Sequence, residues 1–296
     1  MANDDAPTAD FERAADAVVD GDLPTLTALL DRWPTLVAAH SDRPHRGTLL
    51  MYAASNGVED ERQRVPANAV SVADLLIARG ADINQICDVY GGGPGATPLV
   101  GLVTSIHPVE AGLMEELVRA YARSGQSLDG PDGGGLPLLF AFLHRNTQAA
   151  ETLAECGATV MSAPAAAGLG RLHLVREMVE LGPPPTADGS GYAALEWVSQ
   201  DGETAAQFAC FLGALAGRVE VVRFLADAGV DVSAPIHQGR TALHEACWGG
   251  HLDVVEVLVG GGADTEAVDE LFNATPGGWA AHAGHEDIVA FLARKD

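Results

Sequence analysis

The stretch from Gly239 to Asp264 constrains the fold more than any other part of this chain, because weaker copies of it fill most of the remaining sequence. Thr241 is expected to cap a first helix, and Gly250 to end that helix in a left-handed conformation. From Leu252 onward, apolar residues recur at helical spacing and predict a second helix. Copies of such a unit predict a repeat stack, in which each unit packs against its neighbours.

The unit resembles the ankyrin signature, G-x-TPLH-x-AA-x-x-GH-L-x-VV-x-LL-x-x-GAD, at nearly every defining position. Weaker copies, similar to irregular repeats of a bacterial type, begin near Ala14, Thr48, Thr97, Leu136, Ala166, Ala214 and Asn273. The resemblance covers almost the whole chain. It implies an all-α ankyrin-repeat solenoid of about eight helix–turn–helix units, with short β-hairpin-like turns and inserted loops.

The resemblance implies one ankyrin-repeat domain over residues 1–296. We expect 1–35 to form an N-terminal capping unit, 36–207 to hold irregular repeats with insertions, and 208–296 to hold regular repeats and a C-terminal cap. The insertions are a charged run after Gly57, a glycine-rich run before the copy at Thr97, and a proline-containing segment that ends near Gln207. Long loops in a compact protein are commonly lids or binding loops.

The charge of the chain argues against two classes of partner. Its 41 acidic residues outnumber its 17 Lys and Arg residues, which gives a formal charge of −24. Nucleic acids and anionic membranes would repel such a protein. No apolar run reaches the roughly 18 residues of a membrane span, and the N-terminus lacks the apolar core of a signal peptide. We therefore expect a cytoplasmic monomer.

No motif for a metal, a cofactor or a covalent reaction is found. The four cysteines share no metal-type spacing and are expected to be reduced. Gly91–Gly95 lacks the lysine of a phosphate loop. The resemblance places His107, His251 and His285 in one turn position and His244 in another, where they would bond to backbone. His40 and His45 are expected to be solvated. We predict no cofactor and no metal.

Aromatic residues mark the candidate binding surface. Tyr52, Phe140 and Trp279 share one column of the repeat, which is expected to pack between repeats. Trp248 and His282 share the next column outward, which the resemblance places on the open groove. Ser55, Thr104 and Ser105 fall in related columns and are expected to line it. The residues predicted to bind a partner or ligand are Tyr52, Asn56, Tyr90, His144, Trp197, Glu245, Trp248, Trp279 and His282.

Two functions remain open. The favoured one is a scaffold that recognises a partner protein through its concave groove and loop tips. The alternative is a small-molecule-binding protein or an enzyme of specialised metabolism, with acid–base chemistry of the isomerase, cyclase or lyase type. That alternative requires ionisable groups to converge in a deep pocket under the inserted loops. The candidates would be Tyr52, Tyr90, His107, His144, Glu196, Trp197, Glu245 and His282.

Overall fold

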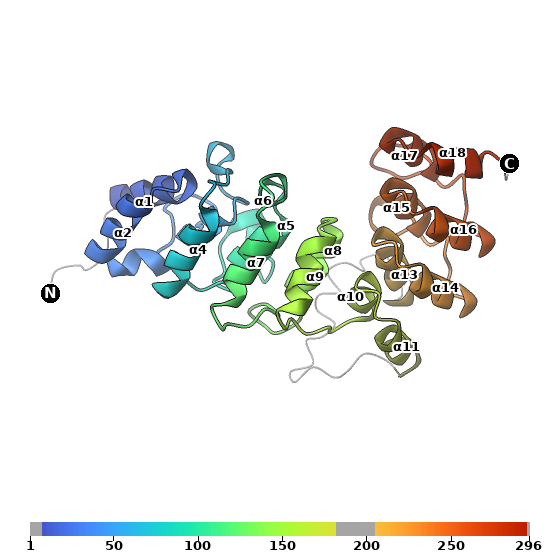
Figure 1. Ribbon diagram of the computed structural model, residues 1–296, viewed down its shortest axis with the longest axis horizontal. Helices are drawn as coiled ribbons and strands as arrows, with labels where there is room; N and C mark the ends of the chain where they lie inside the picture. Colours follow the sequence, from blue (N-terminus) through green and yellow to red (C-terminus); the bar gives the residue numbers. More distant parts are fainter. Residues whose placement is uncertain (1–7, 182–204, 295–296) are drawn as a thin grey trace. The chain divides into compact units, whose positions relative to one another are not determined.

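The computed structural model describes residues 8–181 and 205–294. The chain forms two compact units, Met1–Thr159 and Val160–Asp296. All regular elements within the described residues are helices (Figure 1). None of these helices combines the length and the apolar character needed to span a membrane. The all-helical fold predicted from the repeats is therefore confirmed, while the single domain stays a prediction.

The described part of the first unit contains four helix pairs. They are α1 (Thr8–Asp20) with α2 (Leu23–Arg32), α3 (Leu49–Ala53) with α4 (Ala69–Ala78), α5 (Pro98–Thr104) with α7 (Met114–Ala122), and α8 (Leu136–Leu143) with α9 (Thr147–Glu155). A short helix, α6 (His107–Glu110), and single turns at Pro34–Ala38, Asp60–Arg62 and Val89–Gly91 lie between them. The first helices of the pairs pack in one row, and the second helices pack in another.

The second unit repeats this arrangement. Its pairs are α10 (Ala163–Gly168) with α11 (Leu172–Leu181), α13 (Ala205–Leu215) with α14 (Val219–Asp227), α15 (Ala242–Gly249) with α16 (Leu252–Gly260), and α17 (Pro276–Ala283) with α18 (Glu286–Leu292). In Figure 1, α13, α15 and α17 lie one above the other beside the row of α14, α16 and α18. These pairs match the units predicted from the sequence.

The same cap starts most of the first helices. The hydroxyl groups of Thr48, Thr97, Ser162, Thr241 and Thr275 each accept a hydrogen bond from the amide three residues later. Such caps stabilise a helix by about 1 kcal/mol. Gly250 ends α15 with φ 73°, as predicted. Any side chain at this position would collide with the ring of His285, because its Cβ would lie only 2.6 Å from the His285 Cε1.

A second recurring contact joins successive pairs. In five pairs of the described residues, the residue that precedes the second helix donates a side-chain hydrogen bond to a backbone carbonyl at or just after the end of the first helix of the preceding pair. The donors and carbonyls are Asn68 to Gly21, Asn146 to Val103, Arg218 to Gly168, His251 to Leu215, and His285 to Trp248. The backbone-bonding role predicted for His251 and His285 is confirmed.

Three histidine predictions are wrong. His40 is half-buried and not simply solvated, because its Nδ1 bonds to the Arg46 carbonyl and its Nε2 to the Gln85 amide. His107 begins the additional helix α6, and Leu113 takes the position before α7, so the insertion after α5 displaces His107 from the predicted turn. His45 is not solvated. Its Nε2 lies 3.5 Å from the Tyr52 hydroxyl and 3.4 Å from Glu59 Oε1, while its Nδ1 accepts a hydrogen bond from the Gly47 amide.

The core consists mostly of small and aliphatic residues. Ala246 and Cys247 are fully buried between helices, as their size suggested. Tyr52, Phe140 and Trp279 are also buried, so the packing role predicted for this column is confirmed. Ser55 and Ser105 are buried too, and Ser105 donates to the Ser55 carbonyl. They therefore do not line a groove, contrary to expectation.

Candidate functional site

Four rings form a contiguous cluster in the second unit. We call Trp248, Phe272, Trp279 and His282 the aromatic surface. Trp248 lies edge-on to Trp279 at 5.8 Å between ring centroids and stacks on His282, also at 5.8 Å. Phe272 lies edge-on to Trp279 at 5.7 Å. Trp248 is 39% exposed and Phe272 is 65% exposed, whereas Trp279 is only 4% exposed. Two exposed rings therefore flank a buried one.

A buried carboxylate shapes the loop that carries Phe272. Asp269 accepts hydrogen bonds from the amides of Leu271, Phe272 and Ala274, and from Trp279 Nε1 at 2.9 Å. Burial alone would raise the pKa of Asp269, but these donors hold it below its ordinary value. The carboxylate is therefore charged at neutral pH. It fixes Phe272 and Trp279 relative to each other through one side chain.

His244 fastens the same loop to α15. The Thr241 amide donates to His244 Nδ1, so the ring proton is on Nε2, which donates to the Ala274 carbonyl at 3.1 Å. The ring of His244 also lies edge-on to Trp279 at 5.3 Å. On the other side, His285 bonds to the carbonyl of Trp248. The aromatic surface is thus held by side chains from two successive helix pairs.

Glu245 lies on the same helix as Trp248 and is buried. Its Oε1 accepts a hydrogen bond from Arg240 Nη1 at 3.1 Å, and the Arg240 guanidinium lies 5.5 Å from the ring centroid of Phe211. The structure therefore brings Trp248, Trp279 and His282 together, and places Glu245 in the core of the same helix row. Phe272 was missed by the sequence reasoning because its loop has no equivalent in the repeat signature.

In the first unit, the structure joins Tyr90 and Asn56. The Tyr90 hydroxyl donates to Asn56 Oδ1 at 2.7 Å, and Asn56 Nδ2 donates to Thr104 Oγ1 at 2.9 Å. Tyr90 is 83% exposed and has a positive φ of 51°. His144 is exposed and lies edge-on to Phe140 at 6.2 Å. Trp197 and Glu196 lie outside the described residues.

The inserted segment after Gly57 forms an ionic network that the sequence did not reveal. Arg62 bonds to Glu12 at 2.8 Å and to Asp16 at 2.7 Å, both on α1. Glu59 pairs with Arg43 at 2.6 Å. The Arg62 guanidinium also lies over the Tyr52 ring, 5.6 Å from its centroid. The segment is therefore attached to the helix row rather than free as a lid.

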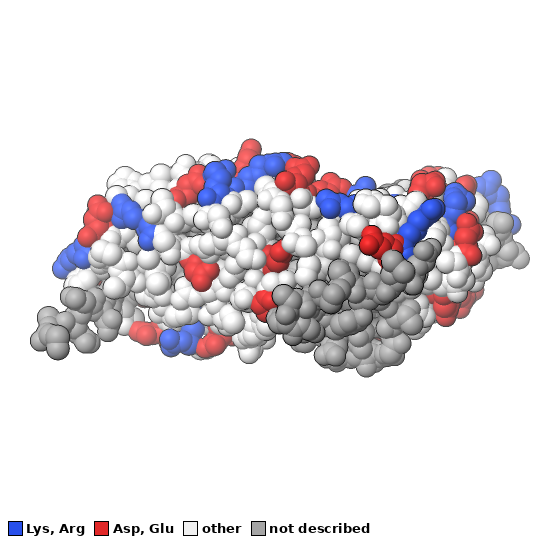
Figure 2. All heavy atoms as spheres, turned by 90° about the horizontal axis from the view of Figure 1, so that it is seen from below, with Lys and Arg blue, Asp and Glu red and all other residues white. Residues whose placement is uncertain are grey.

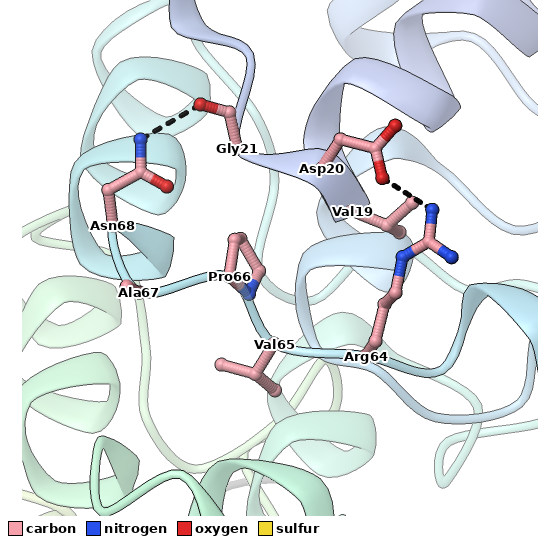
Figure 3. A pocket seen from close by; sticks show the side chains of 8 residues that line it. All are labelled: Val19, Asp20, Gly21, Arg64, Val65, Pro66, Ala67 and Asn68. Carbon is pink, nitrogen blue, oxygen red and sulfur yellow. Dashed lines mark hydrogen bonds and ion pairs between the residues drawn. The ribbon is translucent and has the colours of Figure 1, made fainter.

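A recess of about 620 Å³ lies between the end of α1 and this inserted segment (Figure 3). Its walls are formed by residues 19–21 and 64–68. Asp20 and Arg64 pair across it, and Asn68 Nδ2 donates to the Gly21 carbonyl at 2.9 Å. The recess is open to solvent, and none of the predicted binding or acid–base residues lines it.

Comparison with known proteins supports the repeat assignment. Residues 210–259 match the family model described as ankyrin repeats (many copies). The chain is 35% identical over 125 residues to human ankyrin repeat domain-containing protein 63, which covers 42% of this chain and 30% of that protein. It is 29% identical over 107 residues to mouse protein fem-1 homolog A-like, across 36% of this chain and 15% of the relative.

A third relative is shorter. The zebrafish Notch-regulated ankyrin repeat-containing protein B is 42% identical over 60 residues, which cover 19% of this chain and 49% of that protein. The matched part thus spans at most about half the length of these curated relatives. What they share with this chain is the repeat itself. With the helix pairs, the threonine caps and the bonds between successive pairs, these matches show that the chain is an ankyrin-repeat protein.

Proposed function

We propose that this chain binds a partner protein through the aromatic surface of α15, α17 and the loop between α16 and α17. Ankyrin repeats generally mediate protein–protein interaction. The observation that carries the proposal is the pair of exposed rings, Trp248 and Phe272, on either side of the buried Trp279. Tryptophan in a fixed position is the residue type most often found to dominate binding energy at interfaces.

The rigidity of this surface supports the same proposal. Asp269, His244 and His285 fix its backbone before any partner arrives. A surface that is already ordered loses less conformational entropy when it binds, so more of the contact energy contributes to affinity. Val268 and Leu271, both about half exposed, extend the apolar area along the same loop.

The pocket alternative receives less support from the described residues. It requires acid–base groups that converge in an enclosed site. The recess in Figure 3 is open, and its two charged groups, Asp20 and Arg64, pair with each other. The candidate acid–base groups Tyr90, His144 and His282 lie outside it.

The test begins by identifying a partner. A photo-crosslinking amino acid at position 272, in the full chain, would label what contacts the loop, and the labelled protein would then be purified and titrated by calorimetry. We expect Trp248→Ala to weaken binding by about 2 kcal/mol, or roughly thirtyfold, while circular dichroism stays unchanged. Tyr90→Ala, an exposed aromatic in the other unit, is the matched control and should leave the affinity within twofold. Equal binding by wild type and Trp248→Ala would reject this site.

A further inference from the structure

The charge around the aromatic surface is one-sided. From residue 241 to 293 the chain has no lysine and no arginine. The same stretch contains nine carboxylates, namely Glu245, Asp253, Glu256, Asp264, Glu266, Asp269, Glu270, Glu286 and Asp287. Of these, the buried Glu245 pairs with Arg240, just outside the stretch. Elsewhere acidic groups are often paired, as with Arg123 and Asp74 or Arg119 and Glu155. On the face drawn in Figure 2, blue side chains commonly lie beside red ones.

Three of these carboxylates are close in sequence to the exposed Phe272. Asp264, Glu266 and Glu270 are exposed and belong to the loop that carries Phe272. The Glu270 amide donates to the Gln238 carbonyl at 2.9 Å, which fixes the loop against the turn before α15. Beneath them, Asp269 is charged and already fully bonded. The loop therefore carries exposed negative charge close in sequence to the exposed ring of Phe272.

Both features favour the same kind of ligand group. The face of an aromatic ring carries negative electrostatic potential and attracts guanidinium and ammonium groups. Exposed carboxylates attract the same cations and repel acidic segments. A second copy of this chain, with a charge of −24, does not complement such a surface.

We propose that the partner segment bound at the aromatic surface is basic, with an arginine or lysine against Trp248 or Phe272 and further cations facing Asp264, Glu266 and Glu270. This inference rests on the proposed function, because it names the chemistry of the segment that the surface binds. Apolar contacts with the rings supply part of the affinity, and the negative charge of the loop favours basic segments over acidic ones.

A display selection tests both statements separately. A random peptide library would be selected on the full-length protein, and peptides that also bind Trp248→Ala would be removed. Trp248-dependent peptides enriched in Lys and Arg support the inference. Trp248-dependent peptides with no such enrichment overturn it and leave the proposed function standing. If no peptide depends on Trp248, both proposals fail.

The selected peptides then allow a test of charge alone. Replacing two of the three exposed acids, Glu266→Gln with Glu270→Gln, should weaken binding of a basic peptide about threefold to fivefold at low salt, and added salt should reduce that difference. Glu256→Gln, an exposed acid on α16, is the matched control and should change affinity less than twofold. Full affinity in the double variant would overturn the electrostatic part of the proposal.

Discussion

At the scale of single residues, His244 connects folding to the candidate surface. It is completely buried, and both ring nitrogens are engaged, one by the Thr241 amide and the other by the Ala274 carbonyl. Protonation of Nδ1 would set its proton against the Thr241 amide proton. Burial is the main cause that lowers the pKa of His244 below its ordinary value, and it outweighs the nearby Asp269 carboxylate.

This lowered pKa predicts a pH-dependent stability. Unfolded His244 binds a proton near pH 6.5 and the folded residue does so only at lower pH, so its contribution is complete above pH 6.5 and is lost as pH falls below it. Urea unfolding at pH 7.5 and 5.5 should show wild type losing about 1 kcal/mol more than His244→Gln on acidification. The comparison of two proteins cancels the contribution of His144, whose pKa is lowered in the same direction. Equal losses would contradict this assignment.

At the scale of elements, the insertion after Gly57 behaves as part of the fold. Arg62 is largely buried and joins the single turn Asp60–Arg62 to α1 through Glu12 and Asp16. The network also fixes Glu59 beside Arg43 and His45. Removing the central cation would leave Glu12 and Glu59 close together with less positive charge between them.

We therefore expect Arg62→Met to destabilise the protein by about 2 kcal/mol, measured from the urea midpoint. Arg123→Met is the matched control, because Arg123 makes a comparable pair with Asp74 at an exposed site. It should cost less than about 1 kcal/mol. If the two substitutions have equal effects, the ion pairs of the inserted segment contribute no more to the free energy of unfolding than one exposed ion pair does.

The sequence predicted the helices better than the loops and insertions between them. Helix pairs and caps follow from local spacing, and the buried column of Tyr52, Phe140 and Trp279 follows from the resemblance to the ankyrin repeat, which is why they could be predicted. The position of His107 could not, because the length of an insertion says little about the helix turn inside it. Asp269 was missed because no sequence pattern distinguishes a buried acid in a loop from a solvated one.

At the scale of the whole molecule, the excess of negative charge opposes folding. A formal charge of −24 on 296 residues is spread over the surface, and mutual repulsion is larger in the compact state than in the extended chain. Salt screens this repulsion within a Debye length of about 8 Å at physiological ionic strength. Ion pairs such as Arg119 with Glu155 are weakened by the same screening, but exposed pairs contribute little.

The thermal midpoint should therefore rise by a few degrees between 20 mM and 300 mM sodium chloride at pH 7.5, followed by circular dichroism. Potassium chloride is the control for a specific sodium effect and should give the same shift. A falling midpoint would mean that attractive pairs outweigh the net repulsion.

The side-chain hydrogen bond between successive helix pairs affects which substitutions a repeat can accept. Asparagine, arginine and histidine all donate to a carbonyl at or just after the C-terminal end of a first helix, so the link depends on a hydrogen-bond donor and not on one residue type. Duplicated units can then accumulate substitutions while neighbouring units stay in register. The family model matches residues 210–259, although paired helices run through both described parts of the chain. The helix pairs and their donors thus persist in parts of the chain that the family model does not match.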